Sequence, residues 1–148
     1  EIILACDYQC AADMWSVGCI VAEMLLRTPL FKGQDYVHQM DEILELLGTP
    51  PEDALSAAPE TARAYVLKRQ HAGKDLKAVL PADAGPDAVD IVSGFLKFDP
   101  NERRTAAQAL EHGYVEDFRE EDIEKRSDFE WTDTFASMDK VAIREFFQ

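Results

Sequence analysis

The sequence is poor in the features that mark membrane proteins and secreted scaffolds. It contains no run of about 20 apolar residues, so we expect no membrane span. It has only three cysteines, Cys6, Cys10 and Cys19, an odd number without the spacing of a metal site. This pattern excludes a disulfide framework and favours a reduced intracellular protein. The first residues lack Met and a basic signal region, which predicts a fragment or a processed product.

Basic residues are also scarce. The chain of 148 residues has 15 Lys and Arg against 29 Asp and Glu, which gives a formal net charge of −14. A surface of this sign repels nucleic acids and anionic membranes, so we expect neither as a partner and favour basic ones. The length is sufficient for one domain with a sizeable core.

The apolar spacing predicts a mainly helical protein without a confident strand. Residues 11–27 form a helix that is apolar on nearly every side and is therefore expected to be buried and central. Further helices are expected at 36–47, 60–69, 86–97 and 138–147. Residues 76–80 are expected to be irregular in structure but apolar. Asp35 is placed to cap the second helix, and Thr49 and Thr105 to begin capping boxes with Glu52 and Gln108.

Asp13 stands at the start of the apolar helix and has two interpretations. It is either an N-cap carboxylate or a buried acceptor for backbone N–H groups of another segment. The stretch "DMWSVGCIVAEML" resembles the central helix of the protein-kinase C-terminal lobe. The resemblance implies the second interpretation, in which Asp13, with Trp15 and Gly18 on the same helix, supports the catalytic loop.

The resemblance continues along the whole chain. "EIIL" is similar to the end of the kinase Ala-Pro-Glu segment, and "FDPNERRTAAQALEHGY" is similar to the last helices of the lobe. This implies a buried pair between Glu1 and Arg103 that clamps the activation segment, with the adjacent Arg104 as the other candidate. The implied fold is the helical C-terminal lobe of the protein-kinase fold, which is α+β when intact. Residues 1–118 would form its core, with an insert near 60–80, and 119–148 an acidic loop and tail helix.

Subfamily features resemble the mitogen-activated protein kinases. They include "RTPLFKGQDYVHQMDEILELLGTPPED" and the closing "FEWTDTFASMDKVAIREFF". The resemblance implies a Ser/Thr kinase that acts before proline, in the cytoplasm and the nucleus.

It also implies two docking surfaces for substrates, an upstream kinase and phosphatases. A basic motif would bind the acidic docking patch, and an aromatic motif would bind the apolar docking pocket. The patch consists of Glu120, Glu121, Asp122 and Glu124, and the pocket of Tyr36, Val37, Met40 and Tyr65. The alternative interpretation of the patch is a solvated charged loop, and that of the pocket is ordinary packing of the helix at 36–47 against the insert.

The parts that perform phosphoryl transfer are absent from these 148 residues. The seven glycines are scattered singly, and there is no strand lysine motif, His-Arg-Asp or Asp-Phe-Gly. The histidines His38, His71 and His112 lack metal-ligand spacing. We therefore expect no catalytic residue and no bound cofactor in this chain, with ATP and Mg²⁺ held by the intact parent together with its N-terminal lobe. Two alternatives remain: a non-catalytic kinase-like binding module, and a relative of the cyclin-dependent kinases.

Overall fold

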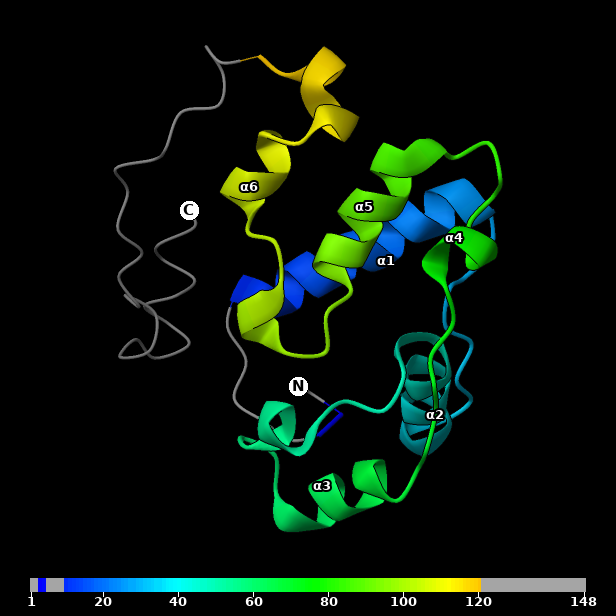
Figure 1. The fold of residues 1–148 in the computed structure, drawn as a ribbon, viewed down its shortest axis with the longest axis vertical. Coiled ribbons are helices and arrows are strands. Elements are labelled where there is room, and N and C mark those ends of the chain that lie inside the picture. The colour runs from blue at the N-terminus through cyan, green and yellow to red at the C-terminus, as the bar shows by residue number, and fades with distance from the viewer. Residues whose placement is uncertain (1–2, 5–9, 121–148) are drawn as a thin grey trace, which may run out of the picture.

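Helices make up all the regular structure in the part of the chain that the computed structural model describes, residues 3–4 and 10–120 (Figure 1). This confirms the expected helical lobe. None of these helices has the length and apolarity that a membrane span requires. The predicted helix at 138–147 lies outside the described residues. In chain order the α-helices and 3₁₀ helices (η) are α1 Cys10–Leu26, α2 Tyr36–Leu47, η1 Glu52–Leu55, α3 Glu60–Leu67, α4 Leu76–Val79, α5 Gly85–Phe95, η2 Pro100–Glu102, α6 Ala106–Leu110 and η3 Gly113–Phe118.

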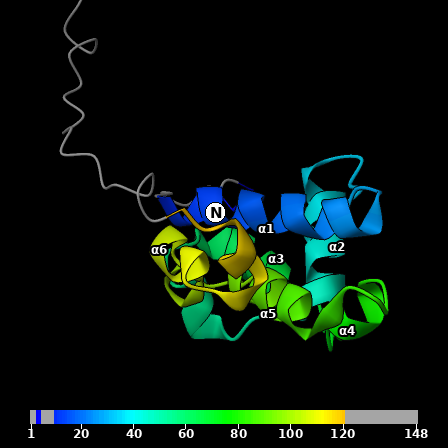
Figure 2. The same ribbon diagram turned by 90° about the horizontal axis from the view of Figure 1, so that it is seen from above.

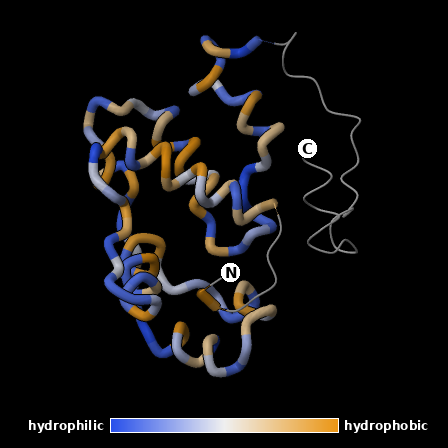
Figure 3. Tube along the Cα trace, turned by 180° about the vertical axis from the view of Figure 1, so that it is seen from behind, coloured by the Kyte–Doolittle hydropathy of each residue, from blue (hydrophilic) through white to orange (hydrophobic). Residues whose placement is uncertain are grey.

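Two apolar clusters form the core. The first lies where α1 packs along α5, and Figures 1 and 2 show these two helices side by side. Its buried members are Ala22, Leu80, Ile91, Val92, Phe95 and Leu96. The second joins α2, η1 and α3, with buried Leu4, Met40, Leu44, Leu55, Ala58 and Val66. We call them the α1–α5 cluster and the α2–α3 cluster. Figure 3 shows the apolar segments gathered where these helices meet.

Two side chains cross between the clusters. Phe98 follows α5 in the chain but packs against the α2–α3 cluster. Leu47 ends α2 but packs against the α1–α5 cluster. Because each cluster receives a side chain from the other's helices, the two halves of the core are joined by packing as well as by the chain.

Helix α1 differs from the expectation of burial on every side. Gly18 and Ala22 are its buried residues, and they face α5. On the opposite face, Ile20 is 57% exposed and Met24 74% exposed, and Val17 is also exposed. The reason is that α5 and the turn around η2 pack on one side of α1, and no described element covers the other side.

The end of α1 is fixed by its own residues. Arg27 adopts the left-handed conformation at φ 58°, and its N–H donates to the Glu23 carbonyl at 2.7 Å. The Glu23 carboxylate then accepts the Leu30 N–H at 3.0 Å. Glu23 thus holds the loop that leads from α1 to α2.

Helix α2 begins and ends as the sequence predicts. The Asp35 carboxylate accepts the His38 N–H at 2.8 Å, and Gly48 follows the helix at φ 86°. The predicted capping box at Thr49 is wrong, because η1 begins at Glu52 after Pro51. The Thr49 hydroxyl instead donates to the Arg69 carbonyl and accepts the His71 N–H. It ties the segment after α3 to the end of α2, a tertiary role that local sequence does not reveal.

Two other expectations about helices have different outcomes. Residues 76–79, expected to be irregular, form the single-turn helix α4, whose first turn is capped by the Asp75 carboxylate. The capping box at Thr105 is confirmed, with reciprocal bonds between Thr105 and Gln108.

Gly18 sets the distance between α1 and α5. A Cβ at this position would lie 2.6 Å from the Phe95 Cβ. We predict that Gly18→Ala lowers the free energy of unfolding by about 1–3 kcal/mol, because the overlap with the Phe95 Cβ, which is fixed to the α5 backbone, forces the helices apart. This loss should exceed the gain of about 1 kcal/mol in helix propensity. Urea denaturation followed by circular dichroism measures it.

Gly94→Ala is the matched control, since Gly94 lies within α5. Its added Cβ would meet the Arg104 guanidinium at 3.0 Å, the far end of a flexible side chain. This variant should be neutral or more stable by up to about 1 kcal/mol. Equal urea midpoints for both variants would show that α1 and α5 are not held at this distance by Gly18.

Candidate functional site

The first turns of α1 place the three predicted support residues on different sides of the helix. Gly18 is buried against α5, Trp15 is half-buried, and Asp13 is exposed. Because α1 begins at Cys10, Asp13 lies inside the first turn, so the interpretation as an N-cap is wrong. The Asp13 carboxylate makes no hydrogen bond or ion pair to the described residues. It shares the exposed face of α1 with Val17 and Ile20.

Arg103 is buried and holds two distant backbone segments together. It is 6% exposed, the one charged residue among the buried side chains of the described chain. Its Nε donates to the Lys97 carbonyl at 2.8 Å, Nη2 to the Phe98 carbonyl at 3.2 Å and Nη1 to the Ala11 carbonyl at 2.9 Å. The guanidinium therefore links the first turn of α1 to the turn that follows α5.

Trp15 covers this guanidinium. The Arg103 Cζ lies 5.0 Å from the centre of the Trp15 ring, within the range of a cation–π contact. The Trp15 ring also stacks on Phe31, with centroids 6.0 Å apart and planes 9° apart. The loop after α1 is thus packed onto the same indole that lies over the buried cation.

The two candidate arginines have different environments. Arg104 lies closer to the surface, where its Nη2 pairs with the Asp90 carboxylate at 2.9 Å. Arg103 is the buried cation that the resemblance requires. Glu1 lies outside the described residues, so the Glu1–Arg103 pair stays a prediction.

A cavity of about 300 Å³ lies between α1 and α2 beside this cation. It is lined by Ile3, Leu4, Ala12, Trp15, Ser16, Met40, Ile43, Phe98 and Arg103. Of the four predicted pocket residues, Met40 lines it. Tyr36 and Val37 lie on the first turn of α2, 77% and 55% exposed, and Tyr65 on α3 packs against the α2–α3 cluster.

Tyr65 belongs to a polar network that the sequence did not predict. Its hydroxyl donates to the Asp41 carboxylate at 3.1 Å, and Arg69 Nε donates to the same oxygen at 2.5 Å. The Arg69 Cζ lies 3.4 Å from the centre of the Tyr65 ring. Burial, with the Asp41 hydrogen bond in second place, raises the pKa of Tyr65, so the phenol stays neutral. The ring is therefore fixed in place beside α2.

A second unpredicted network joins α5 to the last turns. His112 Nδ1 accepts the Tyr114 N–H at 3.0 Å, and Nε2 lies 2.7 Å from Asp90 Oδ2. This arrangement fits the Nε2–H tautomer, with His112 as the donor to Asp90. The hydrogen bonds from His112 and then Arg104 lower the pKa of Asp90. No sequence signal could have found this pairing, since 22 residues separate the partners.

Only part of the acidic docking patch can be placed. Glu120 is exposed at the end of the described chain. Glu121, Asp122 and Glu124 lie outside the described residues, so the patch stays a prediction.

The described residues contain no cluster of the side chains that usually hold a metal ion. No group of three His, Cys, Asp or Glu side chains within residues 3–4 and 10–120 could hold a metal.

Cys19 is half-buried beside Arg103, and burial, with Glu23 adding to the effect, raises the pKa of its thiol to about 11. The thiol is therefore neutral near pH 7 and packs as a small apolar group.

Comparison with known proteins places this arrangement in context. The profile described as the protein kinase domain matches residues 1–115. Among curated proteins, the mitogen-activated protein kinase spm1 of Cytospora mali is 39% identical, covering 100% of this chain and 37% of its own length. Mitogen-activated protein kinase 3 of Arabidopsis thaliana is 44% identical, over 78% of this chain and 32% of its own length. Mitogen-activated protein kinase 12 of Danio rerio is 43% identical, over 84% of this chain and 35% of its own length. The chain thus spans about a third of the length of these relatives.

The buried and the exposed arginine should respond differently to the same change. We predict that Arg103→Lys lowers the free energy of unfolding by about 3 kcal/mol or more. A lysine ammonium cannot reach three carbonyls on two separate segments, and each stranded acceptor costs about 1–3 kcal/mol. Arg104→Lys keeps a cation beside Asp90 and should cost at most about 1 kcal/mol. Guanidinium titrations of the two variants measure this difference, and similar costs would rule out the tie through Arg103.

Proposed function

The chain belongs to the protein kinase domain family, and on this premise we propose that it serves as the helical lobe of a Ser/Thr kinase resembling the mitogen-activated kinases. The observation that carries the proposal is the contact of Arg103 with the first turn of α1, at 2.9 Å from the Ala11 carbonyl. It joins the two motifs that resemble the kinase central helix and the kinase arginine turn.

The proposed parent activity is transfer of the ATP γ-phosphate to a Ser or Thr hydroxyl that precedes proline. ATP with Mg²⁺ supplies the phosphoryl group and neutralises the charge that develops during transfer. The motifs that hold them are absent from the 148 residues, and the described residues contain no metal cluster. The role of this chain is therefore to position other segments and to bind partners.

The exposed face of α1 suits a scaffold for such segments. Asp13 offers a carboxylate with no partner among the described residues, and Ile20 and Met24 follow it at helical spacing as exposed apolar side chains. Apolar helix faces are normally covered. We propose that a catalytic loop and the lobe that precedes it pack here, with Asp13 accepting hydrogen bonds from the loop N–H groups.

The docking role rests on two surfaces. Tyr36 and Val37 are exposed on α2, one turn before Met40 of the α2–α3 cluster, where they can receive an aromatic side chain of a partner. The acidic docking patch would receive basic motifs of substrates, activators and phosphatases, consistent with the net charge of −14. A site of action in the cytoplasm and the nucleus is part of the same proposal.

A chimera tests whether this lobe supports catalysis. In the mitogen-activated protein kinase spm1 of Cytospora mali, which aligns with the whole chain, the matching residues are replaced by residues 1–148. We predict Mg-ATP-dependent phosphorylation of a Thr-Pro peptide and little of a Thr-Ala peptide, measured with radiolabelled ATP. The 148-residue chain alone should show no Mg-ATP binding by calorimetry.

Asp13→Ala in the chimera should lower kcat about tenfold or more, since stranded N–H donors cost about 1–3 kcal/mol. Asp83→Ala, which removes an exposed acid from the loop before α5, is the control and should leave kcat unchanged. A folded chimera without activity would contradict the proposal and favour a non-catalytic binding module.

Charge reversal tests the acidic docking patch. The run from Glu116 to Glu124 carries six acids and one arginine. We predict that Glu121→Lys with Asp122→Lys weakens binding of an Arg-rich docking peptide about tenfold or more at low salt, and less at 0.15 M salt, where the Debye length is about 8 Å. Fluorescence anisotropy titrations at two salt concentrations measure the affinities.

An aromatic peptide directed at Tyr36, Val37, Met40 and Tyr65 serves as the control in the same titrations. Its affinity should not change, because these residues belong to α2 and α3 and not to the reversed patch. An equal loss for both peptides would indicate unfolding, and no loss for the Arg-rich peptide would show that the acids are only a solvated loop.

A further inference from the structure

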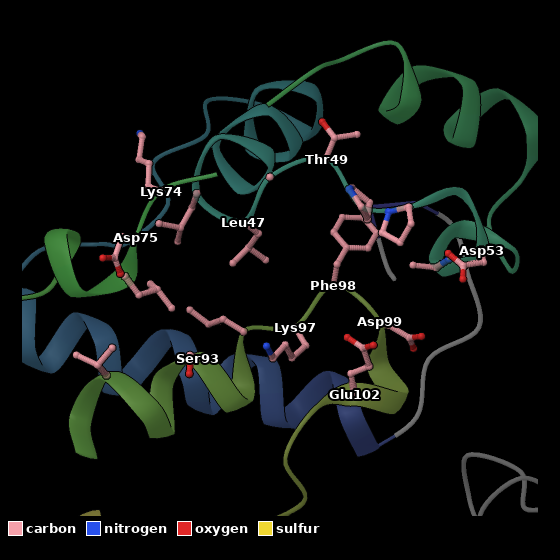
Figure 4. Close-up of a pocket in the computed structure, with 18 residues that line it drawn as sticks. Leu47, Thr49, Asp53, Lys74, Asp75, Ser93, Lys97, Phe98, Asp99 and Glu102 are labelled. Carbon is pink, nitrogen blue, oxygen red and sulfur yellow. The ribbon is translucent and has the colours of Figure 1, made fainter. Parts of the chain in front are cut away.

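A cleft of about 690 Å³ lies between the two apolar clusters, and neither docking surface described above includes it. Its walls come from the end of α2 with η1 on one side and from α4, α5 and η2 on the other (Figure 4). This volume is within the range of pockets that hold a ligand or a few side chains of a partner.

The floor of the cleft is apolar. Leu47, Leu76, Val89 and Leu96 line it, and Figure 4 shows Leu47 and Phe98 pointing into the space from opposite walls. Phe98 and Leu47 are the same side chains that cross between the clusters. The floor is therefore set by core packing, and the pocket is formed before any partner arrives.

One end of the cleft is acidic. Asp53, Asp99 and Glu102 line the cleft, and Figure 4 shows them toward the same end. Asp99 Oδ1 accepts the Asn101 N–H at 2.8 Å, and Asp53 Oδ1 accepts the Ala54 N–H at 3.0 Å. These bonds orient the two carboxylates while Oδ2 of each makes no bond to the described residues. None of the three acids forms an ion pair within that part of the chain.

Neither lysine of the cleft forms an ion pair with these three acids in the part of the chain that the structure describes. Lys74 lies at the opposite end with Asp75, and its Nζ pairs with Glu45 at 3.3 Å. Lys97 also lines the cleft, and its ammonium makes no ion pair within the described residues. With four carboxylates and two ammonium groups on its walls, the cleft has a negative potential that attracts cations.

We propose that this cleft binds a basic, amphipathic segment of a partner protein, with an Arg or Lys side chain at Asp53, Asp99 and Glu102 and an aliphatic side chain on the floor at Leu47, Leu76 and Leu96. The carboxylates of the cleft select the basic part of the partner segment by charge, and the preformed apolar floor selects its aliphatic part. Nucleotides and acidic peptides are disfavoured by the same carboxylates. This binding site does not depend on the proposed kinase activity, so either proposal can fail alone.

The test uses the full chain and a defined probe. The probe is a fluorescein-labelled peptide of ten residues with two adjacent arginines followed by two leucines, and the matched peptide carries glutamine in place of arginine. We expect the arginine peptide to bind with a Kd of about 10–100 µM, as is usual for small transient contacts, and the glutamine peptide about tenfold more weakly. Amide chemical-shift changes in the ¹⁵N-labelled chain should centre on 47–54 and 93–102.

Two charge-matched variants locate the binding. Asp53→Asn with Glu102→Gln removes two charges at the cleft and should weaken the arginine peptide about threefold to tenfold. Glu60→Gln with Asp83→Asn removes two exposed charges that belong neither to the cleft nor to the acidic docking patch, and should change the affinity less than twofold. A loss with the second pair equal to or larger than the first, or shift changes away from the cleft, would overturn the proposal.

Discussion

The arrangement of this chain depends on the placement of one buried guanidinium. Arg103 donates to carbonyls of Lys97, Phe98 and Ala11, and the last of these lies 92 residues away in sequence. A buried charge is costly unless its hydrogen bonds are satisfied, so this geometry strongly disfavours any arrangement in which α1 separates from the turn after α5. Arginine meets the requirement because its planar fork presents five fixed donors, whereas a lysine has one ammonium.

The contacts of Arg103 extend from this tie into both parts of the core. Trp15 lies over the guanidinium and stacks on Phe31, which attaches the loop between α1 and α2. Phe98, whose carbonyl accepts from Arg103, packs into the α2–α3 cluster. The same cation therefore orients the backbone from which the crossing side chain projects. One face of α1 is satisfied by these contacts, while the face with Ile20 and Met24 stays exposed and can receive other segments.

Features with a local cause could be predicted from the sequence, and features with a distant cause could not. The cap at Asp35 and the box at Thr105 and Gln108 involve partners three residues apart, and both form. Thr49 has the same local pattern but bonds Arg69 and His71 instead, because tertiary partners compete successfully for its hydroxyl. The Tyr65–Asp41–Arg69 network had no signal, since its members belong to different helices and a loop.

The candidate site shows the same division. The motif around Trp15 and Gly18 indicated a packed helix, and the structure places both against the α5 side of the core. It could not indicate that Asp13 and Ile20 would face solvent, because apolar content alone does not say which faces of a helix find a partner.

Acidic residues in this chain combine a structural and an electrostatic role. Asp99 caps η2 through Oδ1, and Asp53, which lies within η1, accepts the N–H of the next residue, Ala54. Short 3₁₀ helices need such acceptors at their first turns, so carboxylates collect where chain turns are tight. Here these two turns line the same cleft, and Oδ2 of each carboxylate makes no bond to the described residues. Two of the carboxylates that make the cleft negative are thus held by backbone N–H groups of the turns that carry them. Because Asp53 and Asp99 are oriented by backbone N–H groups, a cationic partner would meet oriented charges and would lose little side-chain freedom on the receptor side.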